Sequence, residues 1–159
     1  MLHAAYIEAA LRDYTQVLDA QGDLGLDFLN ARVPHRFTGI YQLAHSVMRN
    51  VEFFDKLGDT VPQALSAVPL QDSFCQFVVR DGSFITTDSA QDARLNGHTY
   101  QGVVGTYYGV PLLDNAGQLF GTLCHFDVMT YSVSDAEFAF LQKAALLLPK
   151  YMSRLKQRI

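Results

Sequence analysis

The sequence predicts an α+β fold in which an antiparallel sheet is flanked by a first and a last helix. Two groups of β-rich segments, at residues 36–57 and 107–127, are spaced as hairpins, and hairpins are typical of antiparallel sheets. Helical periodicity marks the two ends of the chain. Because 159 residues is a common domain length, we expect residues 1–159 to form a single domain.

The first helix is predicted over residues 2–20, within an N-terminal segment 1–20. Its apolar side chains recur at spacings of three and four and form one narrow stripe: Ala4, Ile7, Leu11, Tyr14 and Leu18. Gly22 and Gly25 end it. The stripe suits packing on the chain's own sheet, and it suits equally a contact with a second copy of the chain.

The middle segment, residues 25–133, is expected to hold the sheet and a pocket. Its β-branched and aromatic runs predict strands, and its Pro, Ser and Gly positions predict short helices and turns. In order, the expected elements are strand–turn–strand at 36–57, a short helix from about Pro62 to Ala67, a helix capped by Ser73 and running to Val79, a strand at 84–87, a short helix at 90–95, and a hairpin of 107–113 with 118–127 around the loop 114–117.

The last helix is expected over residues 134–158. Ser134 and Glu137 form a capping-box pattern at its start, and Pro149 should kink it or end its first part. Apolar residues occupy more than one side of this helix, which favours more than one packing partner. We therefore expect a homodimer built from the terminal helices.

Composition excludes several classes of protein. The chain is 49% hydrophobic and 18% charged, with a formal net charge of −4, and nucleic-acid binding usually needs a basic face. It has no apolar run of 18 residues and no basic start followed by an apolar core, so we expect no membrane span and no signal peptide. Two cysteines do not suggest a disulfide scaffold. A reducing cytoplasm is the expected location.

The order and spacing of motifs between residues 72 and 127 resemble those of a GAF domain, a module that binds small molecules. The resemblance rests on four stretches: Ser73-Phe74-Cys75, Thr87-Asp88-Ser89-Ala90-Gln91-Asp92-Ala93-Arg94, Tyr108-Gly109-Val110-Pro111-Leu112-Leu113-Asp114 and Gly121-Thr122-Leu123-Cys124-His125-Phe126-Asp127. It implies a central antiparallel sheet of five or six strands and a ligand pocket between the sheet and the short helices. It also implies a sensory or regulatory protein that signals through dimeric terminal helices to a protein partner; it names no ligand.

The same resemblance carries over a set of candidate ligand-binding residues: Phe74, Cys75, Phe77, Thr86, Asp88, Asp92, Arg94, Tyr107, Tyr108, Leu123 and His125. Side chains alternate along a strand, so only one of Tyr107 and Tyr108 can face the pocket. We expect a cavity of roughly 300 Å3 or more. Asp88, Asp92 and Arg94 would form a charged lid over it, or only a capped turn with a local ion pair.

The cysteines open an alternative. Free methionine sulfoxide reductases are enzymes with the GAF fold, and Cys75 lies in the first turn of a predicted helix, where a thiolate is favoured. Cys124 lies in an apolar strand and reads as a small buried hydrophobe. Because the cysteine contexts of those reductases are not seen here, we expect no thiol catalysis, no catalytic residue and no enzyme. A ligand-free interaction module is the third possibility.

No cofactor is indicated. Cys124-His125 matches the dipeptide at which bilin-binding GAF domains attach their chromophore, but there the pair lies on a helix and here it lies in a predicted strand. The five histidines are scattered without the spacing of metal ligands, so no metal is expected.

Overall fold

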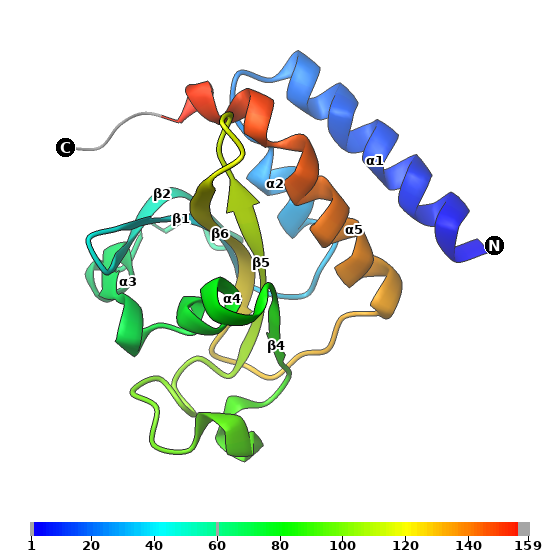
Figure 1. Cartoon of the computed structure of the whole chain (residues 1–159). Helices are drawn as coiled ribbons and strands as arrows, with labels where there is room; N and C mark the ends of the chain where they lie inside the picture. Colours follow the sequence, from blue (N-terminus) through cyan, green and yellow to red (C-terminus); the bar gives the residue numbers. More distant parts are fainter. Residues whose placement is uncertain (1, 60, 156–159) are drawn as a thin grey trace.

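The structure is a computed structural model, and it describes residues 2–59 and 61–155 (Figure 1). Within those residues, six strands form one antiparallel sheet in the order β3-β2-β1-β6-β5-β4. The strands are β1 (Phe37–Ala44), β2 (Val47–Asp55), β3 (Ala67–Pro69), β4 (Phe84–Thr86), β5 (Thr106–Leu113) and β6 (Leu119–Asp127). The predicted α+β class with an antiparallel sheet is therefore confirmed.

Helices cover both faces of this sheet. One face carries α1 (Leu2–Ala20), α2 (Leu26–Asn30) and α5 (Asp135–Leu147), and α1 lies beside α5 (Figure 1). The other face carries α3 (Gln63–Ser66) and α4 (Cys75–Asp81). Short 3-10 turns connect these parts: η1 (Leu70–Asp72), η2 (Ser89–Gln91), η3 (Ala93–Leu95) and η4 (Pro149–Arg154). We name the two faces of the sheet the helix face and the pocket face.

The apolar stripe of α1 packs inside one subunit. Tyr14 and Leu18 are fully buried, in one cluster with α5 residues such as Phe140. The Tyr14 hydroxyl donates a hydrogen bond to the Leu24 carbonyl (2.7 Å), and its ring stacks on Phe28 with centroids 5.6 Å apart. Each such buried side chain contributes roughly 1.5–3 kcal/mol of hydrophobic free energy. The α1 stripe is thus used within the subunit.

The last helix begins as predicted and ends early. The Ser134 hydroxyl accepts a hydrogen bond from the Glu137 backbone N–H (3.2 Å), as an N-cap does. Regular α-helix ends at Leu147, and Pro149, which has no N–H to donate, opens a 3-10 turn. The expected continuation over 156–158 lies outside the described residues.

Two short elements differ from the prediction. Residues 26–30 form the α2 turn, which we had not anticipated, and Ala67–Pro69 form edge strand β3 instead of the end of a helix. Pairing explains the second difference, because Met48 of β2 stands opposite Val68 in the ladder. Among the described residues, no helix combines the length and the hydrophobicity that crossing a bilayer requires.

Alternation along β5 and β6 decides which side chains face the pocket. Tyr107, Cys124 and Phe126 belong to the pocket-face cluster. Leu123 belongs to the cluster under the helices, and Tyr108 lies on that same helix face, with its ring 5.9 Å from that of Phe138. A strand therefore separates neighbouring residues into two chemical environments.

Candidate functional site

A small apolar pocket lies between the pocket face of the sheet and the segments around α3 and α4. Its volume is about 40 Å3. This is far below the roughly 300 Å3 expected, and it holds only about three water-sized groups, since a water needs on the order of 10–15 Å3. The residues that line it are Tyr41, Leu65, Val68, Ser73, Phe74, Cys75, Tyr100, Val104, Tyr107, Cys124 and Phe126.

Two cysteines meet in the wall of this pocket. Cys75 starts α4 and Cys124 comes from the middle of β6, and both line the pocket; the Cys124 thiol donates a hydrogen bond to the Gly39 carbonyl (3.7 Å). Cys75 Sγ also lies 3.2 Å from the Thr122 hydroxyl and accepts a hydrogen bond from the Tyr107 hydroxyl at 3.3 Å. The sulfur of Cys75 is therefore surrounded by hydrogen-bond donors.

The pKa values of the two thiols are shifted in opposite directions. The neighbouring Cys124 thiol lowers the pKa of Cys75; burial opposes this, and the hydroxyls of Ser73, Thr122 and Tyr107 lower the pKa further, to about 6. Burial raises the pKa of Cys124 well above its ordinary value, and the neighbouring Cys75 sulfur with its charge adds to that rise. Cys75 is thus the thiolate of the pair, and Cys124 stays protonated.

A glycine makes room for Tyr107 to reach Cys75. A Cβ built on Gly109 would lie 2.5 Å from both Cε1 and the hydroxyl oxygen of Tyr107, so the tyrosine ring lies along the strand over the bare glycine. Any other residue at this position would push the ring away. The sequence Tyr107-Tyr108-Gly109 therefore places the phenol at the thiol pair.

Of the candidate residues from the sequence, the structure brings three together in the pocket: Phe74, Cys75 and Tyr107. Phe77 is buried behind Phe74, with its ring 4.7 Å from that of Phe84. Thr86 is buried on β4, and neither residue is among those that line the pocket. These two support the wall without facing the cavity.

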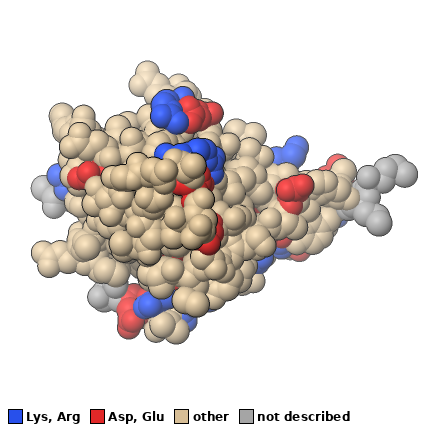
Figure 2. Space-filling view, turned by 90° about the horizontal axis from the view of Figure 1, so that it is seen from below, with Lys and Arg blue, Asp and Glu red and all other residues tan. Residues whose placement is uncertain are grey.

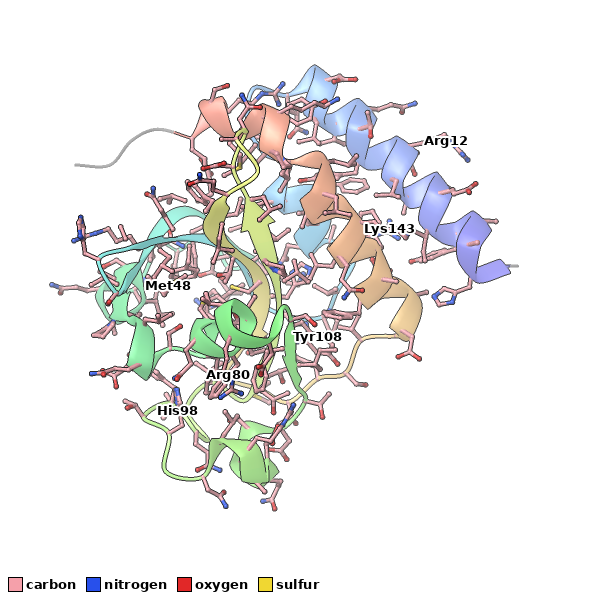
Figure 3. The ribbon with its side chains drawn as sticks, viewed as in Figure 1. Arg12, Met48, Arg80, His98, Tyr108 and Lys143 are labelled. Carbon is pink, nitrogen blue, oxygen red and sulfur yellow. The ribbon has the colours of Figure 1, made fainter. Side chains whose placement is uncertain are left out.

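Tyr108, Leu123 and His125 lie on the opposite, helix face, so the expectation that they face the pocket does not match this structure. Tyr108 is labelled in Figure 3. His125 Nδ1 hydrogen-bonds the Thr38 hydroxyl at 2.6 Å, and its ring stacks on that of buried His35. The reason is register: Tyr108 pairs with His125, and Gly109 pairs with Cys124. Side chains of directly paired residues share one face.

Asp88, Asp92 and Arg94 do not cover the pocket. Arg94 makes a two-pronged ion pair with Asp92 and donates to the Ile85 carbonyl (2.6 Å), while Asp88 precedes a 3-10 turn. Arg94 and Phe77 line a separate surface hollow of about 330 Å3 beside Arg80. In the view of Figure 2, basic and acidic groups lie next to one another in small pairs rather than in a patch of one sign. The alternative of a local ion pair therefore matches the geometry.

Sequence reasoning missed two kinds of residue. Cys124 and Phe126 face the pocket, whereas the candidate set held Leu123 and His125. Tyr107 faces the pocket and pairs with Phe126, so alternation along β6 turns Phe126 and Cys124 to the same side. Tyr41 was also missed; its hydroxyl donates to the Leu65 carbonyl (3.0 Å) and ties α3 over the pocket. Within the described part of the chain, no group of three or more His, Cys, Asp or Glu is placed to hold a metal ion.

Neither family models nor curated proteins match the sequence. Solved structures do match the fold. A free methionine-R-sulfoxide reductase of Neisseria meningitidis, solved in complex with its substrate, aligns with a TM-score of 0.71 at 17% identity over 95% of this chain and 90% of that one. The GAF domain of an Acinetobacter phosphoenolpyruvate-protein phosphotransferase aligns with a TM-score of 0.72 at 14% identity over 93% of both chains.

A type II free methionine-R-sulfoxide reductase of Thermoplasma acidophilum also aligns, with a TM-score of 0.63 at 16% identity over 96% of this chain and 99% of that one. These reductases overturn the expectation that the chain is not an enzyme, because enzymes share its fold over nearly its whole length. Identities this low establish architecture and not activity. The architecture they establish, together with the phosphotransferase domain, is the GAF fold, and this chain has it.

Proposed function

We propose that the chain is a thiol-dependent reductase of small sulfoxides, with Cys75 as the attacking thiolate and Cys124 as the resolving thiol. The observation that carries the proposal is that Cys75 and Cys124 line one pocket, with the Cys75 sulfur beside the Tyr107 and Thr122 hydroxyls, and that the pKa values of the two thiols shift in opposite directions. A lowered pKa is what an attacking cysteine needs, and a protonated neighbour within reach is what resolution needs. The shared fold of the methionine sulfoxide reductases supports the same assignment.

The reaction balances with these two residues and an external dithiol. The Cys75 thiolate attacks the sulfoxide sulfur, and with a proton from solvent the oxygen passes to Cys75 Sγ, leaving a thioether and a sulfenic acid. The Cys124 thiol then attacks Cys75 Sγ, so that an S–S bond forms and the hydroxyl leaves as water with the Cys124 proton. A dithiol reductant returns both residues to thiols. The Tyr107 hydroxyl, 3.3 Å from Cys75 Sγ, is placed to hydrogen-bond the sulfoxide oxygen.

The test separates the two cysteines by the choice of reductant. Wild-type protein should turn over a methyl sulfoxide with either dithiothreitol or thioredoxin, measured as thioether formed. Cys75→Ser should lose both activities. Cys124→Ser should keep turnover with dithiothreitol, which reduces a sulfenic acid directly, and lose turnover with thioredoxin. Wild-type activity that survives Cys75→Ser would overturn the proposal.

A second candidate is a regulatory domain that binds a small ligand in this pocket. The apolar lining favours it, as does the shared fold of the phosphotransferase GAF domain. Under this proposal the protein signals to a partner through a homodimer of its terminal helices, and the cytoplasm keeps both cysteines reduced. Native mass spectrometry of freshly purified protein tests it, because a bound ligand or a dimer appears directly as added mass. Unliganded monomer alone would count against it.

A further inference from the structure

The proposed reaction does not specify which sulfoxide is the substrate. The volume of the pocket limits the size of the group that can enter beside Cys75. About 40 Å3 accommodates roughly three heavy atoms, at about 10–15 Å3 for each water-sized group. A methylsulfinyl group, with one carbon, one sulfur and one oxygen, has this size. A whole amino acid exceeds this volume, so its charged part would have to lie at the open side of the pocket.

The pocket also limits the substrate by charge. Apart from the Cys75 thiolate, none of the described residues that line it carries a charge. Two of its polar groups are already engaged: the Tyr41 hydroxyl donates to the Leu65 carbonyl, and the Ser73 hydroxyl accepts from the Cys75 N–H (2.9 Å). A carboxylate entering the pocket would lose its hydration and meet the Cys75 thiolate without gaining a cationic partner, which strongly disfavours it.

The nearby charged groups are committed to one another. Arg94 and Asp92 pair outside the pocket, and Arg80 pairs with Asp81 through two hydrogen bonds. Each pair is neutral overall and lies at the surface hollow beside Arg80, not at the pocket that holds Cys75 and Cys124. The described residues that line the pocket therefore offer no cationic partner for the carboxylate of a free amino acid.

Resting on the proposed reductase function, we infer that the substrate is a small uncharged sulfoxide, such as a dialkyl sulfoxide, and not a zwitterionic amino-acid sulfoxide. Val104 lines the pocket on its loop side, where it is half-buried against the apolar cluster and restricts the size of the substrate. Its neighbour Val103 is 55% exposed and does not line the pocket. The pair therefore offers a matched test.

The experiment compares kcat/KM for dimethyl sulfoxide and for free methionine sulfoxide, with dithiothreitol as reductant. We expect dimethyl sulfoxide to be preferred at least tenfold. Val104→Phe should lower kcat/KM for dimethyl sulfoxide at least tenfold, while Val103→Phe stays within twofold; melting curves check that both variants fold.

Each other outcome is decisive. Preference for free methionine sulfoxide would overturn the uncharged substrate and leave the reductase standing. An equal effect of the two phenylalanine substitutions would overturn the assignment of this cavity as the substrate site. No reduction of either sulfoxide would overturn the reductase and the inference together.

Discussion

Replacing His35 by Phe should make the protein resist acid better than the wild type. His35 is fully buried on the helix face, and neither of its ring nitrogens has a hydrogen-bond partner among the described residues. Its ring contacts those of Tyr108, Tyr131 and His125, at centroid distances of 5.4, 5.6 and 6.2 Å. Phe can keep these ring contacts, and it removes the imidazole, which must stay unprotonated while it is buried.

The magnitude follows from the pKa values. Burial lowers the pKa of His35 to about 4; the charge of Asp127 partly opposes this, and the charge of Lys56 adds to it. An unfolded histidine titrates near 6.5, so between pH 6.5 and 4 the unfolded state binds a proton that the folded state does not. Stability is therefore full above pH 6.5 and falls as the pH drops. By pH 5 this histidine alone removes about 2 kcal/mol, at about 1.36 kcal/mol per pH unit.

The assay is urea unfolding at pH 7.5 and pH 5. The loss of unfolding free energy between the two should be about 2 kcal/mol smaller in His35→Phe than in the wild type. His125, whose pKa burial lowers to about 3, continues to contribute in both proteins. His3→Phe, at an exposed position, is the control and should behave as the wild type. Equal pH dependence in His35→Phe and wild type would show that His35 reaches water in the folded protein.

Four further results are expected. The rate at which iodoacetamide modifies Cys75, measured by mass spectrometry, should rise with pH with a midpoint near pH 6. A midpoint above pH 8 would contradict the assignment of Cys75 as a thiolate at neutral pH. Gly109→Ala should displace Tyr107 and so raise that midpoint, because the phenol no longer stabilises the thiolate. Ser134→Ala should cost about 1 kcal/mol in urea unfolding by removing the N-cap. The protein should sediment as a dimer at micromolar concentration, and Leu146→Glu should dissociate it, because this α5 side chain is 70% exposed.

Each of these changes has a control or a contrary outcome. Gly22→Ala meets no atom within 4 Å and should leave the thiol midpoint in place. Ser132→Ala, at an exposed position outside the helix, should leave stability unchanged, and an equal cost at both serines would count against the cap. A monomeric wild type, or a dimer indifferent to Leu146→Glu, would show that the terminal helices do not form the interface.

The elements that the sequence predicted are those with strong local signals. The α1 stripe, the Ser134 cap and the hairpin loop 114–117 each depend on residues close together in the chain, and each forms where expected. Strand β3 depends instead on pairing with β2, and the sequence of a three-residue segment does not predict this tertiary contact. Propensity alone therefore found the sheet but not its edge.

The pocket was harder to predict because it depends on strand parity. Phe74 and Cys75 were candidates because of the resemblance to a GAF domain, and Tyr107 was one of two open choices. Cys124 was read as inert because its immediate neighbours are apolar. Its chemistry comes from Cys75, which is 49 positions earlier and meets it only through packing of α4 on the sheet. Reactivity created by a tertiary contact leaves no local pattern.

The register of one hairpin decides which chemistry faces the pocket. Asp114 Oδ1 accepts hydrogen bonds from the N–H groups of Ala116 (2.9 Å) and Gln118 (3.0 Å), and a bulge follows Leu112. Together they set β6 so that Cys124 stands opposite Gly109. A slip of one residue would turn every side chain of β6 to the other face, placing His125 toward the pocket and Cys124 under the helices. The loop that looks purely structural is therefore a condition for the thiol pair, although it lies at the far end of the strands.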